Sequence, residues 1–383
     1  MNNVQISVLI PMYNREHYII DCVNSVLTQS FQDFEIVIVD DGSTDSSYEL
    51  CSEKFGHLQN FRLIKNPKNM GEWKTTNRLI KEARGKYIAI LHSDDLFLPH
   101  ALNNLYAVAE ATNADVVHCI GRAQSSDGNG SIITPNSKLY PFIHDKNPVQ
   151  EITVMSDDPH QRLLEWLTGG TFIDPQYNLF NREFMLKNNI FWIGFGGHTL
   201  FTFLWLMSAE VYVKVPFFTY VYRSSPDSMS KKQKSPEDVK QAIERHISSV
   251  FKTLQYYDYL MDRMDFLKDN DLLKDYIKLH IFFINDNWNI WRTQLYEHGI
   301  TSEIYQAVKI SMEKYFGNSA WLPTFLYHIM HEQQFGRSIE SEKLFIESCL
   351  ASSTRGGGRI ILFIYFLFQL SKIKVDSFEV YNE

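Results

Sequence analysis

Two adjacent acids follow a short apolar run within the first hundred residues. The run covers 87–91, and the residues directly after it are His92-Ser93-Asp94-Asp95. Carboxylate oxygens on a rigid support are the ligands that hard divalent cations prefer, and such a cation neutralises the charge that develops on a diphosphate leaving group. The pair therefore indicates a metal and diphosphate site. The alternative is a solvated turn at a helix start, and on either interpretation we expect both acids to contribute little to the core.

A second acidic pair, Asp40 and Asp41, ends another apolar run at 34–39. Its position suits Asp40 for a hydrogen bond to a nucleotide base or a ribose hydroxyl. The residues behind the pair are of types that cap helices, and we assign Ser43 and Thr44 to the cap of a helix over 46–55. Asp40 is thus predicted to contact a nucleotide, and the role of Asp41 stays open.

A parallel sheet is predicted to position these acids. Strand-like runs at 6–10, 34–40, 61–65, 87–91 and 115–119 alternate with helical patterns at 17–29, 45–55, 72–83 and 99–111. Nearly continuous apolar strands separated by helices indicate a sheet covered on both faces. Ligands of such sheets bind at the carboxyl ends of the strands. Both acidic pairs fall at that edge, as does the segment 11–15 behind the first strand.

Composition and missing motifs exclude several other classes of protein. The net charge of −8 argues against a nucleic-acid partner, since proteins that bind phosphate backbones normally carry a basic surface. The first strand–helix turn lacks the G-x-G-x-x-G of dinucleotide sites. The 4 cysteines show no C-x-x-C spacing, and we expect them to be buried free thiols. Without a secretion signal or an apolar run near the roughly 20 residues of a membrane span, we expect a cytoplasmic protein.

The remaining sequence predicts a long loop and then a second domain. Residues 121–159 are typical of an excursion over the sheet edge; helical patterns at 160–167, 182–188 and 199–209 and strand-like runs at 211–215 and 217–222 follow. The polar stretch 224–237 is typical of a linker. We therefore expect an α/β domain over 1–225 and a mainly α-helical domain over 235–383. Within the tail at 355–374, an apolar run with cationic flanks favours a core or dimer-forming helix over peripheral membrane contact, because apolar residues cover every face.

Four segments, in this order along the chain, resemble the family 2 glycosyltransferases. They are 6–14 with Pro11-Met12-Tyr13-Asn14, 37–45 with Asp40-Asp41, 69–77 with Asn69, Gly71 and Asn77, and 85–95 with the acidic pair at its end. The resemblance implies the GT-A fold, a Rossmann-like nucleotide-sugar-binding domain with a mixed, mainly parallel sheet. It also implies inverting transfer of a sugar from a nucleoside-diphosphate sugar, most commonly a UDP-sugar, to an acceptor hydroxyl.

The resemblance also assigns residues, with two departures from the family pattern. Metal binding, to Mn²⁺ or Mg²⁺, falls to His92, Asp94 and Asp95, although His92 stands where the family carries a first acid. The family's Ala-Arg-Asn reads Thr75-Thr76-Asn77 here, so that Lys74 or Arg78 is expected to replace the missing arginine. The nucleotide-sugar contacts that the resemblance implies are Pro11, Tyr13, Asn14, Asp40, Asn69, Gly71, Lys74, Asn77, Ser93 and Asp94.

An inverting transfer needs a general base for the acceptor hydroxyl. Many family members place an acidic pair before a Leu-Phe-x-Phe helix, and the matching stretch here is Gly196-Gly197-His198-Thr199, followed by an apolar run at 200–206. His198 therefore falls where the catalytic acid is expected, and a histidine can accept a proton near neutral pH. The alternative is a histidine at a helix start in a site that is unusual or inactive.

Several partners and two rival functions follow from this interpretation. The acceptor is expected to be a glycan, a lipid-linked sugar or a protein, in synthesis of a bacterial-type surface glycan or glycoconjugate. The helical domain is expected to serve in acceptor binding, in a homodimer, or in peripheral contact with the inner face of the membrane. The rivals are a catalytically silent scaffold with the same fold, and a nucleotidyltransferase. The latter would carry a Gly-rich loop behind the first strand, and segment 11–15 has no glycine.

Overall fold

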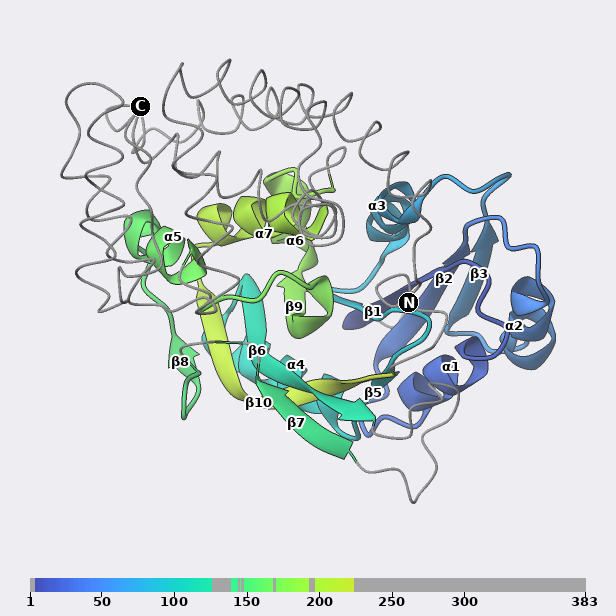
Figure 1. Ribbon diagram of the computed structural model, residues 1–383, viewed down its shortest axis with the longest axis horizontal. Helices are drawn as coiled ribbons and strands as arrows, with labels where there is room; N and C mark the ends of the chain where they lie inside the picture. The colour runs from blue at the N-terminus through green and yellow to red at the C-terminus, as the bar shows by residue number, and fades with distance from the viewer. Residues whose placement is uncertain are drawn as a thin grey trace, which may run out of the picture. The chain divides into compact units, whose positions relative to one another are not determined.

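One mixed sheet organises the residues described by the computed structural model, which are 4–125, 139–143, 145, 148–167, 170–192 and 197–223. Its strands run in the order β3-β2-β1-β4-β9-β6-β10-β5, with β7 beside β6 and β8 beside β10 (Figure 1). The strands are β1 (Ile6–Met12), β2 (Phe34–Asp40), β3 (Phe61–Lys65), β4 (Tyr87–Ile90), β5 (Leu96–Phe97), β6 (Val116–Ser125), β7 (Leu139–Ile143), β8 (Thr153–Val154), β9 (Asn178–Asn181) and β10 (Tyr212–Tyr222). The helices are α1 (Ile19–Leu27), α2 (Ser47–Phe55), α3 (Glu72–Glu82), α4 (Ala101–Thr112), α5 (Pro159–Leu167), α6 (Arg182–Lys187) and α7 (Gly197–Ser208), with a short 3₁₀ turn at Pro175–Tyr177.

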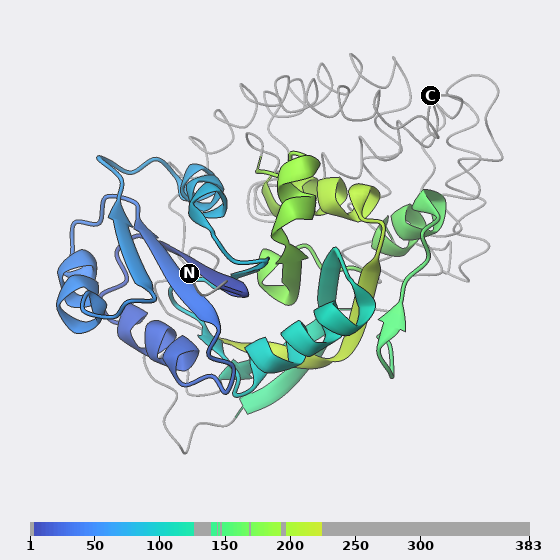
Figure 2. The same cartoon turned by 180° about the vertical axis from the view of Figure 1, so that it is seen from behind.

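The first half of the sheet is parallel. β1 pairs in parallel with both β2 and β4, and β2 pairs in parallel with β3. Alternate residues of β1, such as Val8 and Ile10, share one buried cluster with Cys22 and Val26 of α1 and Leu105 of α4. Helix α3 contacts β1 and β2, and both views place it on the other side of the sheet from α1 and α2 (Figures 1 and 2). The apolar strands are thus covered on both faces, as predicted.

The second half of the sheet is mixed because of β9, which the sequence pattern does not reveal. This strand is antiparallel to both β4 and β6, and β10 then runs parallel to β6. Its sequence is Asn-Leu-Phe-Asn, so only two apolar residues mark it. The two strand-like runs expected at 211–215 and 217–222 form the single strand β10, which shifts register after Val215 and after Phe218. The expected α/β fold class with a mixed, mainly parallel sheet is confirmed.

Two further expectations, on a loop and on a helix cap, need correction, and two others fall outside the described residues. Residues 121–125 extend β6 and pair with residues 139–143 of β7. The predicted loop over 121–159 is therefore wrong at these two segments, which are strands. Neither Ser43 nor Thr44 caps α2: the N-cap residue is Ser46, without a side-chain cap bond, while Ser43 and Thr44 bond to Asn14. The helical domain over 235–383 and the tail at 355–374 lie outside the described residues. In the described part of the chain, no helix is long and apolar enough to cross a membrane.

Candidate functional site

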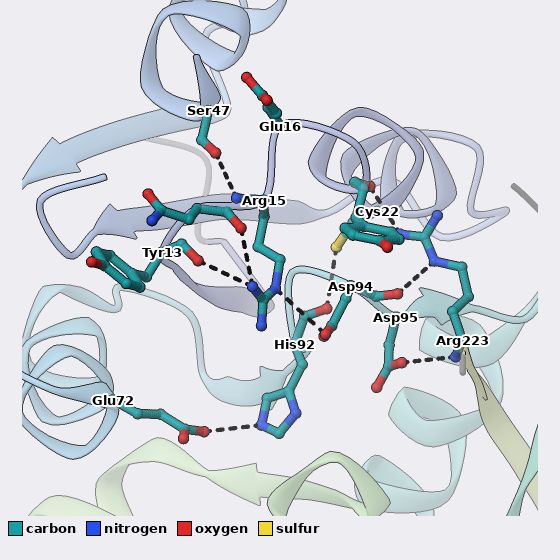
Figure 3. Close-up of polar contacts among 12 residues, drawn as sticks. Tyr13, Arg15, Glu16, Cys22, Ser47, Glu72, His92, Asp94, Asp95 and Arg223 are labelled. Carbon is teal, nitrogen blue, oxygen red and sulfur yellow. Dashed lines mark hydrogen bonds and ion pairs between the residues drawn. The ribbon is translucent and has the colours of Figure 1, made fainter. Parts of the chain in front are cut away.

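The loops behind β1 and β2 are tied together at the carboxyl edge of the sheet. Asn14 adopts a left-handed backbone with φ 51°, which turns the chain sharply after β1. Its amide donates to Ser43 Oγ at 2.9 Å, and its side-chain Oδ1 accepts from the amide of Thr44 at 2.9 Å. The amide of Arg15 donates to Ser47 Oγ at 2.7 Å. The backbone amide and the side-chain oxygen of Asn14 therefore join the loop behind β1 to the loop behind β2. The Arg15 side chain points toward the β4 loop (Figure 3).

Asp41, whose role the sequence left open, fixes the loop behind β3. Its Oδ1 accepts from the Asn66 side chain at 2.7 Å and from the Met70 amide at 2.8 Å, and its Oδ2 accepts from the Gly71 amide at 2.9 Å. Gly71 has φ +91°, a conformation that favours glycine. Asp41 is thus a structural acid. Its position lets Asn69 and Gly71 face the same edge as the other predicted contacts.

Asp40 lies at the bottom of this edge. Its side chain is fully buried, accepts the amide of Ser43 at 3.2 Å and lies 3.9 Å from Lys65 Nζ. Both carboxylate oxygens share this one amide, Oδ1 at 3.3 Å, so acceptor capacity remains, since an ionised carboxylate has about four lone-pair sites. The structure puts Asp40 at the predicted edge, and its contact with a base or ribose stays a prediction.

The β4 loop gathers three candidate metal ligands. His92, Asp94 and Asp95 each offer one ligand atom, and these atoms lie within 4.8 Å of one another. Among the described residues this is the one such group of three. Asp94 Oδ2 lies 3.4 Å from Arg15 Nε, and His92 Nε2 lies 3.4 Å from Glu72 Oε1 (Figure 3). A turn bond from the Asp95 amide to the His92 carbonyl, at 2.9 Å, holds the three side chains on one side of the loop.

Asp95 is more deeply buried than expected. It is 2 % exposed, accepts from Gln176 Nε2 at 2.8 Å and accepts from the backbone amide of Arg223 at 3.0 Å. Burial, with the neighbouring Asp94 charge, raises the pKa of Asp95 to about 7. The expectation that both acids contribute little to the core is therefore wrong for Asp95, because its removal would leave two buried donors without a partner. It holds for Asp94, whose side chain is 23 % exposed.

Arg223 secures the cluster from behind. This residue directly follows β10, is 1 % exposed and donates through Nε to the Asp94 carbonyl. Its Nη1 pairs with Asp21 at 3.2 Å, and its Nη2 donates to the Tyr18 carbonyl at 2.9 Å, both on or beside α1. One guanidinium thus joins the first helix, the β4 loop and the last described strand. It fixes the position of the acidic pair.

His92 and His198 face each other across the site. Burial lowers the pKa of His92, but the nearby Glu72, Asp95 and Asp94 carboxylates outweigh it and raise the pKa above its ordinary value. The two imidazole rings are 6.3 Å apart between centroids. His198 lies at the start of α7, and its Nδ1 is buried without a hydrogen-bond partner among the described residues. The structure therefore brings the predicted base within reach of the predicted metal ligands.

Other predicted contacts have varied surroundings. Both amide atoms of Asn77 bond to the backbone of Trp192, at 2.8 and 2.9 Å, which joins α3 to the segment before α7. Arg78 donates to Asn66 Oδ1 at 2.6 Å, so its guanidinium supports the Asp41 loop. Lys74 and Asn69 are exposed, Tyr13 is 41 % exposed, Pro11 is half-buried and Ser93 is buried.

Sequence reasoning missed three residues at this site, namely Arg15, Gln176 and Arg223. Arg223 pairs with Asp21 over a separation of 202 residues, and Gln176 bonds to Asp95 over 81 residues. No local pattern connects such positions. Arg15 had a usable signal, because it is a cation directly behind the first strand, at the edge where ligands of parallel sheets bind.

Comparison with known proteins agrees with this architecture. Residues 7–187 match the model of the family described as Glycosyl transferase family 2. The chain is 31 % identical over 182 residues to "Glycosyltransferase GlyG" of Streptococcus pneumoniae, a match that spans 46 % of this chain and 57 % of that protein. It is 33 % identical over 130 residues to "Poly(ribitol-phosphate) beta-glucosyltransferase" of Bacillus spizizenii, a match that spans 33 % of this chain and 20 % of that protein. Each match thus spans less than two thirds of the relative's own length.

Solved structures show the same fold. The crystal structure of S. aureus TarS 1-349 in complex with UDP-GlcNAc superposes with a TM-score of 0.54 at 18 % identity, covering 98 % of this chain and 94 % of that one. At this identity the likeness is one of fold. This likeness shows that the described residues have the GT-A fold, and the family match places residues 7–187 in glycosyl transferase family 2.

Proposed function

We propose that this protein transfers a sugar from a UDP-sugar to a hydroxyl group of a bacterial surface glycan, with inversion at the anomeric carbon. The observation that carries the proposal is the group of His92, Asp94 and Asp95, whose ligand atoms lie within 4.8 Å at the carboxyl edge of the sheet. The buried Asp40 ends β2 at the same edge, and the ring of His198, whose Nδ1 has no partner among the described residues, lies 6.3 Å from that of His92. This arrangement combines a nucleotide contact, a diphosphate site and a base at one edge.

A UDP-sugar is the donor that the structural neighbours support. Two crystal structures of S. aureus TarS 1-349 are complexes with UDP-GlcNAc and with UDP. In this chain Asp40 has acceptor capacity for a base N–H, and the partly exposed ring of Tyr13 is available for stacking on the base. Poly(ribitol-phosphate) beta-glucosyltransferase, by its name, glucosylates poly(ribitol-phosphate), which supports a hydroxyl-rich polymer as the acceptor class here.

The residues of the cluster fit a divalent cation. Two carboxylates suit Mg²⁺ or Mn²⁺, and the imidazole of His92 favours Mn²⁺ over the more strictly oxygen-preferring Mg²⁺. Asp94 and His92 are partly exposed, so a cation can reach them, while Gln176 and Arg223 hold Asp95 in place. When bound, the ion would neutralise charge on the departing diphosphate.

His198 is the group proposed to take the proton from the acceptor hydroxyl. Support for this role comes from the 6.3 Å between the ring centroids of His198 and His92, because a donor whose diphosphate contacts the cluster would have its anomeric carbon near this pair. Nδ1 of this imidazole has no partner among the described residues, so it keeps the hydrogen-bonding capacity that contact with a substrate hydroxyl needs. The rival function, a silent scaffold with the same fold, is motivated by the same residue. It predicts donor binding without turnover.

Donor binding tests the proposal through Asp94. Asp94→Asn should weaken UDP binding in Mn²⁺ by about tenfold or more, since a charged ligand to the cation is lost while the side-chain shape is kept. The measurement is calorimetric titration of the full chain with UDP, in Mn²⁺ and in EDTA. Asp33→Asn is the matched control, because Asp33 is exposed and lies at the opposite end of β2. Equal wild-type affinities in Mn²⁺ and EDTA would contradict a role for the metal.

A further inference from the structure

Arg15 is a cation held against the acidic cluster with hydrogen-bonding capacity to spare. Its backbone is fixed by Ser47 Oγ, and its Nη1 donates to the carbonyls of Asn14 at 3.0 Å and Tyr13 at 3.3 Å. Its Nε lies 3.4 Å from Asp94 Oδ2, and both side chains are about one quarter exposed, at 27 % and 23 %. Within the described part of the chain, Nη2 has no partner. The guanidinium is therefore anchored from behind while one end stays open (Figure 3).

Four other described cations near this edge are engaged elsewhere or lie outside the cluster. Arg223 is buried and uses all three of its nitrogens on Asp94, Asp21 and Tyr18. Arg78 bonds to Asn66 and to the Lys65 carbonyl. Lys65 lies over the Tyr48 ring, with Nζ 4.5 Å from its centroid, and near Asp40. Lys74 is exposed on α3.

We propose that Arg15 binds the diphosphate of the donor and that, without ligand, it occupies Asp94 in place of the divalent cation. The inference rests on the proposed function and adds a residue to it. It replaces the expectation that Lys74 or Arg78 takes over from the family's missing arginine. A diphosphate carries more negative charge than one divalent cation neutralises, and a planar guanidinium with open donors is suited to phosphate oxygens.

The exchange follows from competition for one carboxylate. Asp94 Oδ2 cannot give its full charge both to Arg15 and to a cation, and two positive charges beside each other repel. Cation binding at Asp94 therefore releases the guanidinium. Its anchor on the Tyr13 and Asn14 carbonyls keeps the released group at the site, where the diphosphate arrives. Arg15 thus competes with the divalent cation for Asp94 but binds the diphosphate.

Arg15→Gln in the full chain tests this by an effect of opposite sign on the two ligands. Mn²⁺ alone should bind about two- to fivefold more tightly than to wild type, because a partly exposed ion pair that competes for Asp94 is gone. UDP should bind about ten- to a hundredfold more weakly, in EDTA as well as in Mn²⁺, because a charge-assisted contact is lost. Calorimetry measures both. Arg15→Lys should keep part of the UDP affinity, and Arg84→Gln, at an exposed arginine outside the cluster, should change neither.

Two results would overturn the assignment: UDP affinity of Arg15→Gln within twofold of wild type, or Mn²⁺ binding that is unchanged or weaker. A melting curve equal to wild type shows that the variant is folded. If the wild type itself binds no UDP, the proposed function fails and the phosphate role of Arg15 fails with it. If wild type and Arg15→Gln bind UDP equally, the assignment of Arg15 alone is wrong.

Discussion

His198→Ala should slow sugar transfer by about 10²–10⁴-fold, the usual cost of removing a general base, while UDP affinity stays within about twofold of wild type. Binding should be spared because the donor contacts are proposed for Asp40, Asp94 and Arg15. The fold should also be spared, since His198 Nδ1 has no partner among the described residues and the change breaks no protein hydrogen bond there. Steady-state transfer rates alongside calorimetry measure the two effects.

Two comparison variants sharpen this test. His198→Asp restores the residue type that the family usually carries and should recover part of the rate. His17→Ala removes a histidine whose side chain is 73 % exposed and should leave the rate unchanged. Transfer by His198→Ala at close to the wild-type rate would remove His198 from the mechanism. Asp174, beside the 3₁₀ turn at Pro175–Tyr177, would then be the next candidate base.

Lys214→Met should destabilise the fold by about 3–5 kcal/mol, the range for breaking a buried ion pair. Lys214 Nζ is fully buried and bonds to Asp145 Oδ2 at 2.7 Å, to Glu165 Oε1 and to the Gly170 carbonyl. Methionine fills the same space but leaves two carboxylates without their cation. Lys86→Met is the matched control. The side chains of Lys86 and Glu110 are 47 % and 38 % exposed, so this ion pair should contribute at most about 1 kcal/mol to stability.

The same variant should show a characteristic pH dependence. Burial raises the pKa of Glu165 even with Lys214 opposing it, so removing Lys214 raises that pKa further. A carboxyl with a raised folded-state pKa favours the folded state at low pH, and this contribution is lost as pH rises through that value. The deficit in melting temperature relative to wild type should therefore shrink as pH falls from about 8 to about 5. A deficit that stays constant or grows would contradict a buried, charged Glu165.

The parallel half of the sheet was predictable because its physics is local. β1, β2, β3 and β4 are short apolar runs, and helices such as α3 carry their own period, so each element appears in a window of about ten residues. β9 was not predictable from such a window, because its pairing with β4 and β6 stabilises only two apolar residues between asparagines. Tertiary pairing, and not propensity, makes it a strand.

The residues of the site also fall into those that local sequence predicts and those whose role depends on distant contacts. The acids at the strand ends follow from the rule that ligands bind there, so Asp40 and Asp94 could be named from sequence. Whether a named residue binds a ligand or holds a loop depends on distant partners. Asn77 faces Trp192 across 115 residues, and Asp95 is enclosed by Gln176 and Arg223, which come from other strands and turns. Such partners follow only from the assembled sheet.

Release of UDP tests most directly whether this chain uses a UDP-sugar as a glycosyl donor. The purified chain of residues 1–383, supplied with Mn²⁺, a panel of UDP-sugars and a ribitol-phosphate or oligosaccharide acceptor, should release UDP from at least one donor. Asp94→Asn and His198→Ala should reduce the release by about two orders of magnitude or more, and Asp33→Asn should not. UDP release that is absent from every donor, from a protein that binds UDP, would contradict catalysis and leave the silent scaffold. Release that is equal in wild type and both site variants would show that the cluster at the β4 edge is not the active site.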